Sequence, residues 1–182
     1  MRSCLLTLGL CLAAVVCFAA NDAMMGTWKL NESKSKIGAG APKNHTVTYE
    51  AAGDDIKVTI DGTAADGTTM HSEWTGKFDG KDYPSTGNPN EDMRSAKQIN
   101  DHTIDVTSKK GGKVVLTAHV VVAADGKSRT VTVNGTDAQG KKYKSTAVYD
   151  KQLEDHLPER CHRSDALPLT SEREGICNLL TL

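Results

Sequence analysis

The strongest constraint on the fold is the alternation of residue types between positions 26 and 151. Short runs rich in Val, Ile and Thr are separated by Gly, Asp and Asn, and within the runs apolar and polar residues alternate. None of these runs has the period of an amphipathic helix. Runs of this kind, spaced about 8–12 residues apart, are typical of an antiparallel β-sandwich or β-barrel.

The direction of the side chains can be tested across the turns, because a slip of one residue turns every side chain to the other face of a sheet. Three apolar residues of one run alternate with polar ones and are expected to face inward: Ile56, Val58 and Ile60. A two-residue turn at positions 53–54 pairs Ile60 with Val47, and a loop centred on Ala65 pairs it with Met70. Both partners are apolar, so this register is self-consistent.

Two Asp-Gly pairs predict further hairpin turns. A turn at positions 79–80 sets Tyr83 opposite Gly76, where the absence of a side chain leaves room for a ring. A turn at positions 125–126 places the apolar residues of the preceding run inward: Val114, Leu116, Ala118, Val120 and Val122.

The second half of this region repeats part of the first, since residues 131–140 match residues 58–67 at a constant offset. One turn breaks the alternation. A two-residue loop at Gly111 and Gly112 sends Ile104 outward, whereas a three-residue loop over 110–112 returns it to the apolar face. We therefore expect a three-residue loop with a bulge there.

The runs predict about ten strands joined by short connections. Their expected ranges are 26–31, 44–52, 55–62, 68–79, 81–84, 93–100, 102–110, 113–124, 127–135 and 142–151. Only 38% of the residues are hydrophobic, and the first 19 positions hold a large share of them. A closed barrel has no exposed edges and needs a smaller apolar core than a packed sandwich. The sequence therefore favours an all-β, antiparallel up-and-down barrel of about 8–10 strands, with a sandwich as the alternative.

The amino-terminal segment resembles a secretory signal peptide. Arg2 gives a short positive region, residues 5–19 are apolar apart from Thr7 and Gly9, and residues 17–19 form an A-x-A-like cleavage site. We expect residues 1–19 to be removed and the protein to be secreted or periplasmic, without stable membrane insertion after cleavage. An uncleaved anchor is the alternative, although the apolar run is shorter than the roughly 20 residues of a spanning helix.

Residues 24–151 form the predicted barrel, and residues 152–182 form a tail that we expect to be poorly ordered. The tail holds the two cysteines that remain after cleavage, Cys161 and Cys177. In an oxidising compartment they either close a small disulfide loop or stay unpaired, and the sequence leaves both open.

Both ends of the predicted barrel resemble the calycin superfamily. Residues 25–33 (MGTWKLNES) contain the Gly-x-Trp that opens the first strand of lipocalins, and they are similar to the opening of the intracellular fatty-acid-binding proteins. Residues 145–151 (STAVYDK) resemble the closing strand of that family. The chain also resembles exported bacterial proteins described only as lipocalin-like. The resemblance implies a barrel with Trp28 closing one end and a ligand in the lumen.

The chain departs from the fatty-acid-binding pattern at two places. Residues 35–44 are too short for that family's helical lid, and Ala147 stands where the family has the arginine of its Arg-x-Tyr motif, although Tyr149 matches the tyrosine. A register centred on Ala138 places Arg129 opposite Ala147 and beside Tyr149. We therefore expect Arg129 and Tyr149 to hold an anion, with Tyr143 and Ser145 nearby. The alternative is that Arg129 reaches solvent at the rim.

Four apolar residues form the predicted aromatic side of the lumen, either as ligand contacts or simply as core: Tyr49, Met70, Trp74 and Phe78. The candidate ligand-binding residues are thus Arg129, Tyr149, Tyr143, Tyr49 and Trp74.

No combination of residues predicts catalysis, a cofactor or a metal site. The histidines show no metal-ligand spacing. In the sequence His71-Ser72-Glu73, alternation sends Ser72 inward and its neighbours outward, so they cannot form a triad. The near-neutral formal charge of −1 argues against a nucleic-acid partner.

The sequence thus predicts an exported barrel that binds a small, mostly apolar ligand, with an anionic lipid-like molecule as one candidate. The alternative is a non-enzymatic protein-interaction or inhibitor module with a filled interior. Such a module would use the barrel surface and loops, above all residues 85–92, to contact a protein partner that the sequence does not identify.

Overall fold

A computed structural model of the chain describes residues 23–137 and 139–152. These residues contain ten strands and one short 3₁₀ helix, joined by turns and loops. In chain order they are β1 (Gly26–Leu30), η1 (Glu32–Lys34), β2 (Lys43–Ala52), β3 (Asp55–Thr63), β4 (Thr69–Gly76), β5 (Tyr83–Thr86), β6 (Met93–Asn100), β7 (Thr103–Lys110), β8 (Lys113–Val122), β9 (Ser128–Thr136) and β10 (Lys142–Lys151). The expected signal peptide and both tail cysteines lie outside the described residues.

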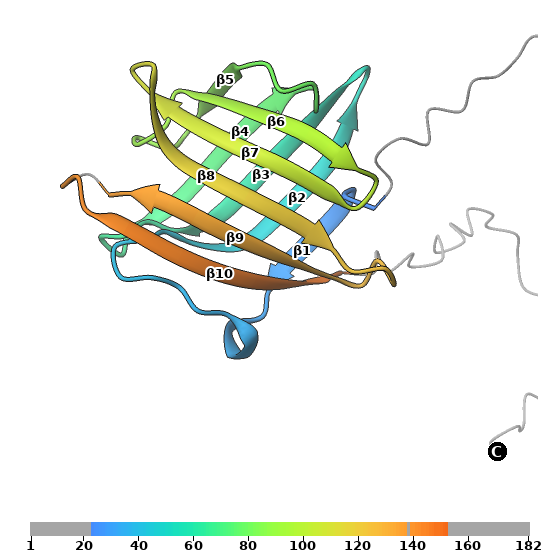
Figure 1. Cartoon of the computed structure of the whole chain (residues 1–182), viewed down its shortest axis with the longest axis horizontal. Helices are drawn as coiled ribbons and strands as arrows, with labels where there is room; N and C mark the ends of the chain where they lie inside the picture. The colour runs from blue at the N-terminus through green and yellow to red at the C-terminus, as the bar shows by residue number, and fades with distance from the viewer. Residues whose placement is uncertain (1–22, 138, 153–182) are drawn as a thin grey trace, which may run out of the picture.

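The strands form a closed antiparallel barrel in which each strand pairs with the next along the chain (Figure 1). Pairing of β1 with β10 closes the sheet, with Trp28 opposite Lys151 and Leu30 opposite Tyr149. Every connection is a hairpin or a short loop, apart from the 31–42 segment that carries η1. The predicted all-β, up-and-down barrel is therefore confirmed, and the sandwich alternative is wrong.

The inward set of residues is as predicted apart from Val114, but two hairpins are shifted by two positions. Ile60 pairs with Val47 as expected, yet its partner on β4 is Ser72 rather than Met70. In the repeated hairpin, Arg129 pairs with Tyr149 rather than with Ala147. Both shifts have one cause, because each loop is centred one residue later than predicted, on Asp66 and Gln139 rather than on Ala65 and Ala138. A shift of two residues keeps every side chain on its face.

The two loops have equivalent hydrogen bonds. The amide of Ala64 donates to the carbonyl of Thr68 at 2.8 Å, and that of Asp137 donates to the carbonyl of Lys141 at 2.9 Å. In each loop a glycine has a positive φ, 85° at Gly67 and 82° at Gly140. A left-handed glycine ends such a three-residue hairpin loop with a bulge, so the sequence repeat corresponds to a repeated turn.

The predicted three-residue loop over 110–112 is wrong. Lys110 pairs with Lys113 across a two-residue turn in which Gly111 and Gly112 both have positive φ. This is the turn that best matches the twist of a hairpin. The expected irregularity lies instead within the strands, after Ser108, and it turns Val114 outward to 55% exposure. The inward direction predicted for Val114 is therefore also wrong.

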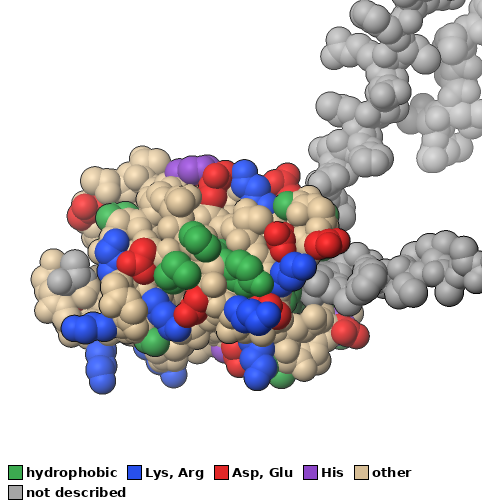
Figure 2. Space-filling model, turned by 90° about the horizontal axis from the view of Figure 1, so that it is seen from above, with side chains coloured by type: hydrophobic (Ala, Val, Ile, Leu, Met, Phe, Trp, Pro, Cys, Tyr) green, Lys and Arg blue, Asp and Glu red, His purple; other side chains and the backbone are tan. Residues whose placement is uncertain are grey.

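The core is concentrated toward one end of the barrel, where Trp28 is fully buried. Its indole donates to the carbonyl of Met24 at 2.9 Å, which fixes the chain just before β1 across this end. On the outside, basic and acidic side chains are intermixed around a few hydrophobic ones (Figure 2). The face shown carries no extended patch of one charge.

Candidate functional site

A buried arginine lies among three aromatic rings at the end closed by Trp28. Arg129, on β9, is only 3% exposed, so the alternative that it reaches solvent at the rim is wrong. Its guanidinium carbon is 4.8 Å from the ring centroid of Trp28, 5.0 Å from that of Tyr49 and 4.9 Å from that of Tyr149. A cation within about 6 Å of an aromatic face is attracted by the ring. The three rings therefore replace part of the solvation that Arg129 loses.

Hydrogen bonding of this guanidinium is incomplete. Nε and Nη1 of Arg129 are shielded from solvent and have no partner within the described residues. Burial raises the pKa of Tyr149 to about 12, although the charge of Arg129 opposes the rise. The neutral Tyr149 hydroxyl donates to the carbonyl of Asn44 at 3.1 Å. A buried cation with unsatisfied donors is suited to an anion, which is the chemistry that the sequence predicts for Arg129 and Tyr149.

A cavity of about 650 Å³ lies at the opposite end of the barrel. Its lining combines apolar side chains with polar ones, among them Met70, Leu116, Tyr143, Ser108 and Glu91. Burial also raises the pKa of the Tyr143 phenol, with a further contribution from Asp137. Ligand pockets in proteins commonly have volumes of about 300–1,000 Å³, so the cavity is large enough for a small organic molecule.

The five candidate residues therefore do not form one site. Tyr143 lines the cavity, whereas Arg129 and Tyr149 are not among the residues that line it. Tyr143 and Tyr149 lie on the same strand, about 20 Å apart along it at about 3.3 Å per residue. The structure thus brings Tyr49 and Tyr149 to Arg129 but leaves Tyr143 at the open end.

Trp74 belongs to an aromatic cluster between these regions. Its ring stacks on Phe78 at 6.4 Å between centroids, and Phe78 meets Tyr49 edge-on at 6.4 Å. Tyr83 meets Trp74 edge-on at 6.0 Å. Gly76 makes this packing feasible as predicted, because a Cβ there would lie 2.6 Å from Cγ of Tyr83. Trp74 and Tyr49 therefore act as core residues, and a role in ligand contact stays a prediction.

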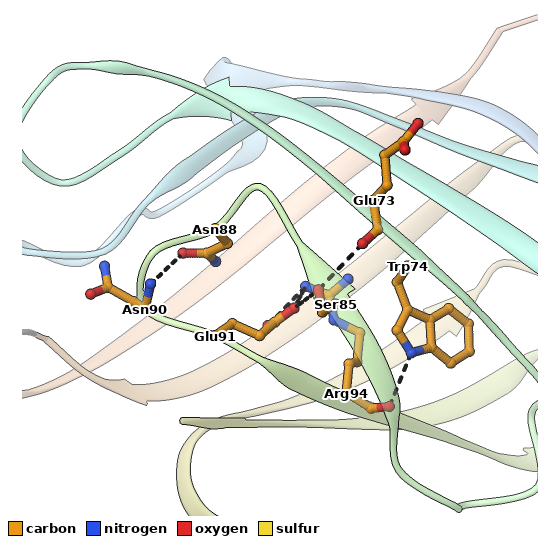
Figure 3. A network of polar contacts seen from close by, with 7 residues as sticks. All are labelled: Glu73, Trp74, Ser85, Asn88, Asn90, Glu91 and Arg94. Carbon is orange, nitrogen blue, oxygen red and sulfur yellow. Dashed lines mark hydrogen bonds and ion pairs between the residues drawn. The ribbon is translucent and has the colours of Figure 1, made fainter. Parts of the chain in front are cut away.

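A buried ion pair beside the cavity was not predicted. Glu91, in the loop between β5 and β6, is 4% exposed. Nη2 of Arg94 lies 2.9 Å from Oε1 of Glu91 and 3.0 Å from Oε2, and Ser85 donates a hydrogen bond to Oε1 (Figure 3). Trp74 donates from Nε1 to the carbonyl of Arg94 at 3.0 Å. The network joins the loop to the barrel wall.

The sequence held one signal for this network. Arg94 and the apolar Ala96 have the same parity, so alternation along β6 predicts that Arg94 lies on the inner face with Ala96, which the structure buries to 3% exposure. Nothing comparable marks Glu91, because it lies in an irregular loop without a period.

The direction of the His71-Ser72-Glu73 side chains is confirmed. Ser72 is 2% exposed and faces inward, whereas the side chains of His71 and Glu73 are 58% and 43% exposed. Within residues 23–137 and 139–152, His, Cys, Asp and Glu side chains form no group of three that could hold a metal ion. The same residues contain no helix with the length and apolar character needed to cross a bilayer.

Comparison with known proteins finds similarity only among solved structures. No family model and no curated protein matches the chain. Among solved structures, the chain is similar to a redesigned β-barrel, mFAP1, bound to DFHBI, at 15% identity and a TM-score of 0.39. The match covers 72% of this chain and 98% of that one. At this level the comparison carries no conclusion about function.

Proposed function

We propose that this protein is an exported, calycin-like barrel that binds one small, mostly apolar ligand in its lumen. The signal-peptide features of residues 1–19 support export to the periplasm or the exterior. The resemblance of both barrel ends to lipocalins and fatty-acid-binding proteins supports a binding role. The proposal does not include a catalytic step.

The cavity of about 650 Å³ at the open end is the observation that carries the proposal. Small side chains are frequent among the buried residues of the barrel, and one of them, Ser108, lines the cavity. They are Ser72, Ser85, Ala96, Ser108, Ser145 and Ala147. A barrel used only for surface contacts needs no hollow interior, since large apolar side chains would stabilise it more by filling the space. The mixed lining fits a mostly apolar molecule with a few polar atoms.

Binding of the neutral fluorophore N-phenyl-1-naphthylamine to the full exported protein tests the proposal. Leu116→Trp replaces an aliphatic side chain of the cavity lining with a bulky indole. We expect it to weaken binding of the fluorophore about tenfold or more, which corresponds to about 1.4 kcal/mol. Val121→Trp is the matched control, because Val121 lies on the same strand but faces outward at 38% exposure. Equal affinities of the two variants would place the fluorophore outside the lumen and contradict the proposal.

Native mass spectrometry distinguishes the alternative function. A barrel purified with an additional lipid-sized mass supports ligand binding. A bare chain that also fails to bind the fluorophore favours a protein-interaction or inhibitor module. Such a module offers a second groove of about 480 Å³ between β8 and the β9–β10 hairpin as a contact surface. The exposed Val114 lines this groove.

A further inference from the structure

Two buried polar atoms without partners lie on neighbouring strands, and the residue that carries one of them, Ser108, lines the cavity, whereas Arg94 is paired with Ser108 but is not itself a lining residue. Arg94 on β6 and Ser108 on β7 are directly paired across the sheet. Ser108 is 1% exposed and lines the cavity, and its Oγ has no hydrogen-bond partner within the described residues. Nε of Arg94 is likewise buried and unpartnered there. The two atoms do not satisfy each other.

One nitrogen of the Arg94 guanidinium is already engaged. Its Nη2 contacts both carboxylate oxygens of Glu91, as Figure 3 shows, and Ser85 donates a further hydrogen bond to that carboxylate. The network therefore holds the guanidinium through Nη2, and the buried Nε has no partner among the described residues. This nitrogen carries one hydrogen and can only donate, whereas the Ser108 hydroxyl can both donate and accept. Together they suit an oxygen atom that accepts a hydrogen bond.

The charges around these atoms select against an anion. Glu91 neutralises Arg94, so a second carboxylate would face an acidic neighbour in a poorly solvated site. The cavity lining also contains Asp66 and Asp137 but, among basic residues, only Lys110. An uncharged oxygen satisfies both unpartnered atoms without this repulsion, because buried polar groups need partners whether or not charge is involved.

We propose that Arg94 Nε and Ser108 Oγ form a polar subsite that binds an uncharged oxygen, such as an alcohol or a carbonyl, of an otherwise apolar ligand. The inference rests on the proposed lumenal binding and adds to it the chemical class of the ligand. The subsite is separate from Arg129, which lies at the closed end of the barrel and has no acidic partner among the described residues. The subsite at the open end binds a neutral oxygen, whereas Arg129 at the closed end is the site for an anion.

Displacement of N-phenyl-1-naphthylamine by dodecan-1-ol and by dodecanoate tests this division in the full exported protein. Ser108→Ala removes the hydroxyl with little change in volume, and we expect it to weaken dodecan-1-ol about fivefold while dodecanoate and the fluorophore bind as before. Ser108→Thr keeps the hydroxyl and retains the affinity for the alcohol. Thr107→Ala is the matched control, because Thr107 is the next residue on β7 and faces outward by alternation.

Each outcome separates the inference from the proposed function. Unchanged binding of dodecan-1-ol to Ser108→Ala overturns the subsite, and equal weakening of dodecanoate shows that a carboxylate occupies it instead. Either result leaves lumenal binding intact as long as the fluorophore binds. If neither fluorophore nor alcohol binds the unmodified protein, the proposed function and this inference fail together. Equal urea midpoints of the variants ensure that a loss of affinity is not a loss of folding.

Discussion

Removal of one charge from the buried Glu91–Arg94 pair gives the sharpest test of the structure. Glu91→Gln keeps the shape of the side chain and an oxygen that accepts from Ser85, but it leaves the Arg94 guanidinium without its counter-ion. The side chains of Glu91 and Arg94 are 3% and 13% exposed, and their contacts are 2.9 and 3.0 Å. Removing one partner of a buried pair costs about 3–5 kcal/mol.

The lower part of that range applies here, because the adjoining cavity admits water to a residue that is already 13% exposed. A loss of about 3 kcal/mol is a large part of the roughly 5–15 kcal/mol by which domains are stable. With a urea m-value of about 2 kcal/mol/M, the unfolding midpoint falls by about 1.5 M. Urea unfolding of the full chain, followed by circular dichroism, measures this shift directly.

Two further variants decide whether the lost charge is the cause. Glu91→Gln combined with Arg94→Met removes both charges and should recover most of the stability, since the isolated cation is what costs free energy. Glu73→Gln is the surface control. It removes a carboxylate that lies 2.6 Å from Lys57, but that pair is largely solvated and the midpoint should change little. A shift below about 0.5 M for Glu91→Gln, or a double variant no more stable than the single one, would refute the reasoning.

Three other predictions follow from the aromatic end and the glycine positions. Arg129→Met should weaken dodecanoate binding markedly in the displacement assay, whereas Lys97→Met, at an exposed site, should not; an unchanged dissociation constant would exclude Arg129 as an anion site. Because burial raises the pKa of Tyr149 from 10.0 to about 12, the stability it contributes is complete below about pH 10 and is lost as pH rises to 12. That loss is about 1.4 kcal/mol per pH unit, and Tyr149→Phe should remove it from the pH dependence of urea unfolding; an equally steep decline would contradict the assignment. Gly76→Ala should lower stability by about 1–3 kcal/mol, because its Cβ would lie 2.6 Å from Cγ of Tyr83; a neutral result in thermal unfolding would show that the ring moves freely.

The sequence predicted the inner face of the barrel better than the pairing across it. The direction of Ile56, Val58 and Ile60 follows from the period of two alone, and all three are buried. Their partners on β4 depend on where the loop is centred, and the turn ending at the left-handed Gly67 moves that centre by one residue, which the apolar pattern does not detect. A shift of two positions leaves apolar residues opposite apolar or small ones, so alternation cannot reveal the error.

The candidate site was predictable only in part, for a related reason. Arg129 and Tyr149 are on strands, and their parity brought them together even with the wrong register. Glu91 is in a loop, and its burial depends on an ion pair with Arg94 that local periodicity does not encode. Ser108 was inward by parity, but its lack of a partner becomes visible only when the side chains around it are placed.

The closure of the barrel by β1 and β10 brings the first and last described residues to the same end of the barrel. The amide of Gln152 donates to the carbonyl of Thr27 at 2.8 Å, so the described chain begins and ends at one end of the barrel, as Figure 1 shows. That end is the one filled by Trp28, and the cavity opens at the other. A tether joined directly to residue 23 or residue 152 would therefore attach at the closed end of the barrel and leave the mouth of the cavity clear for a ligand.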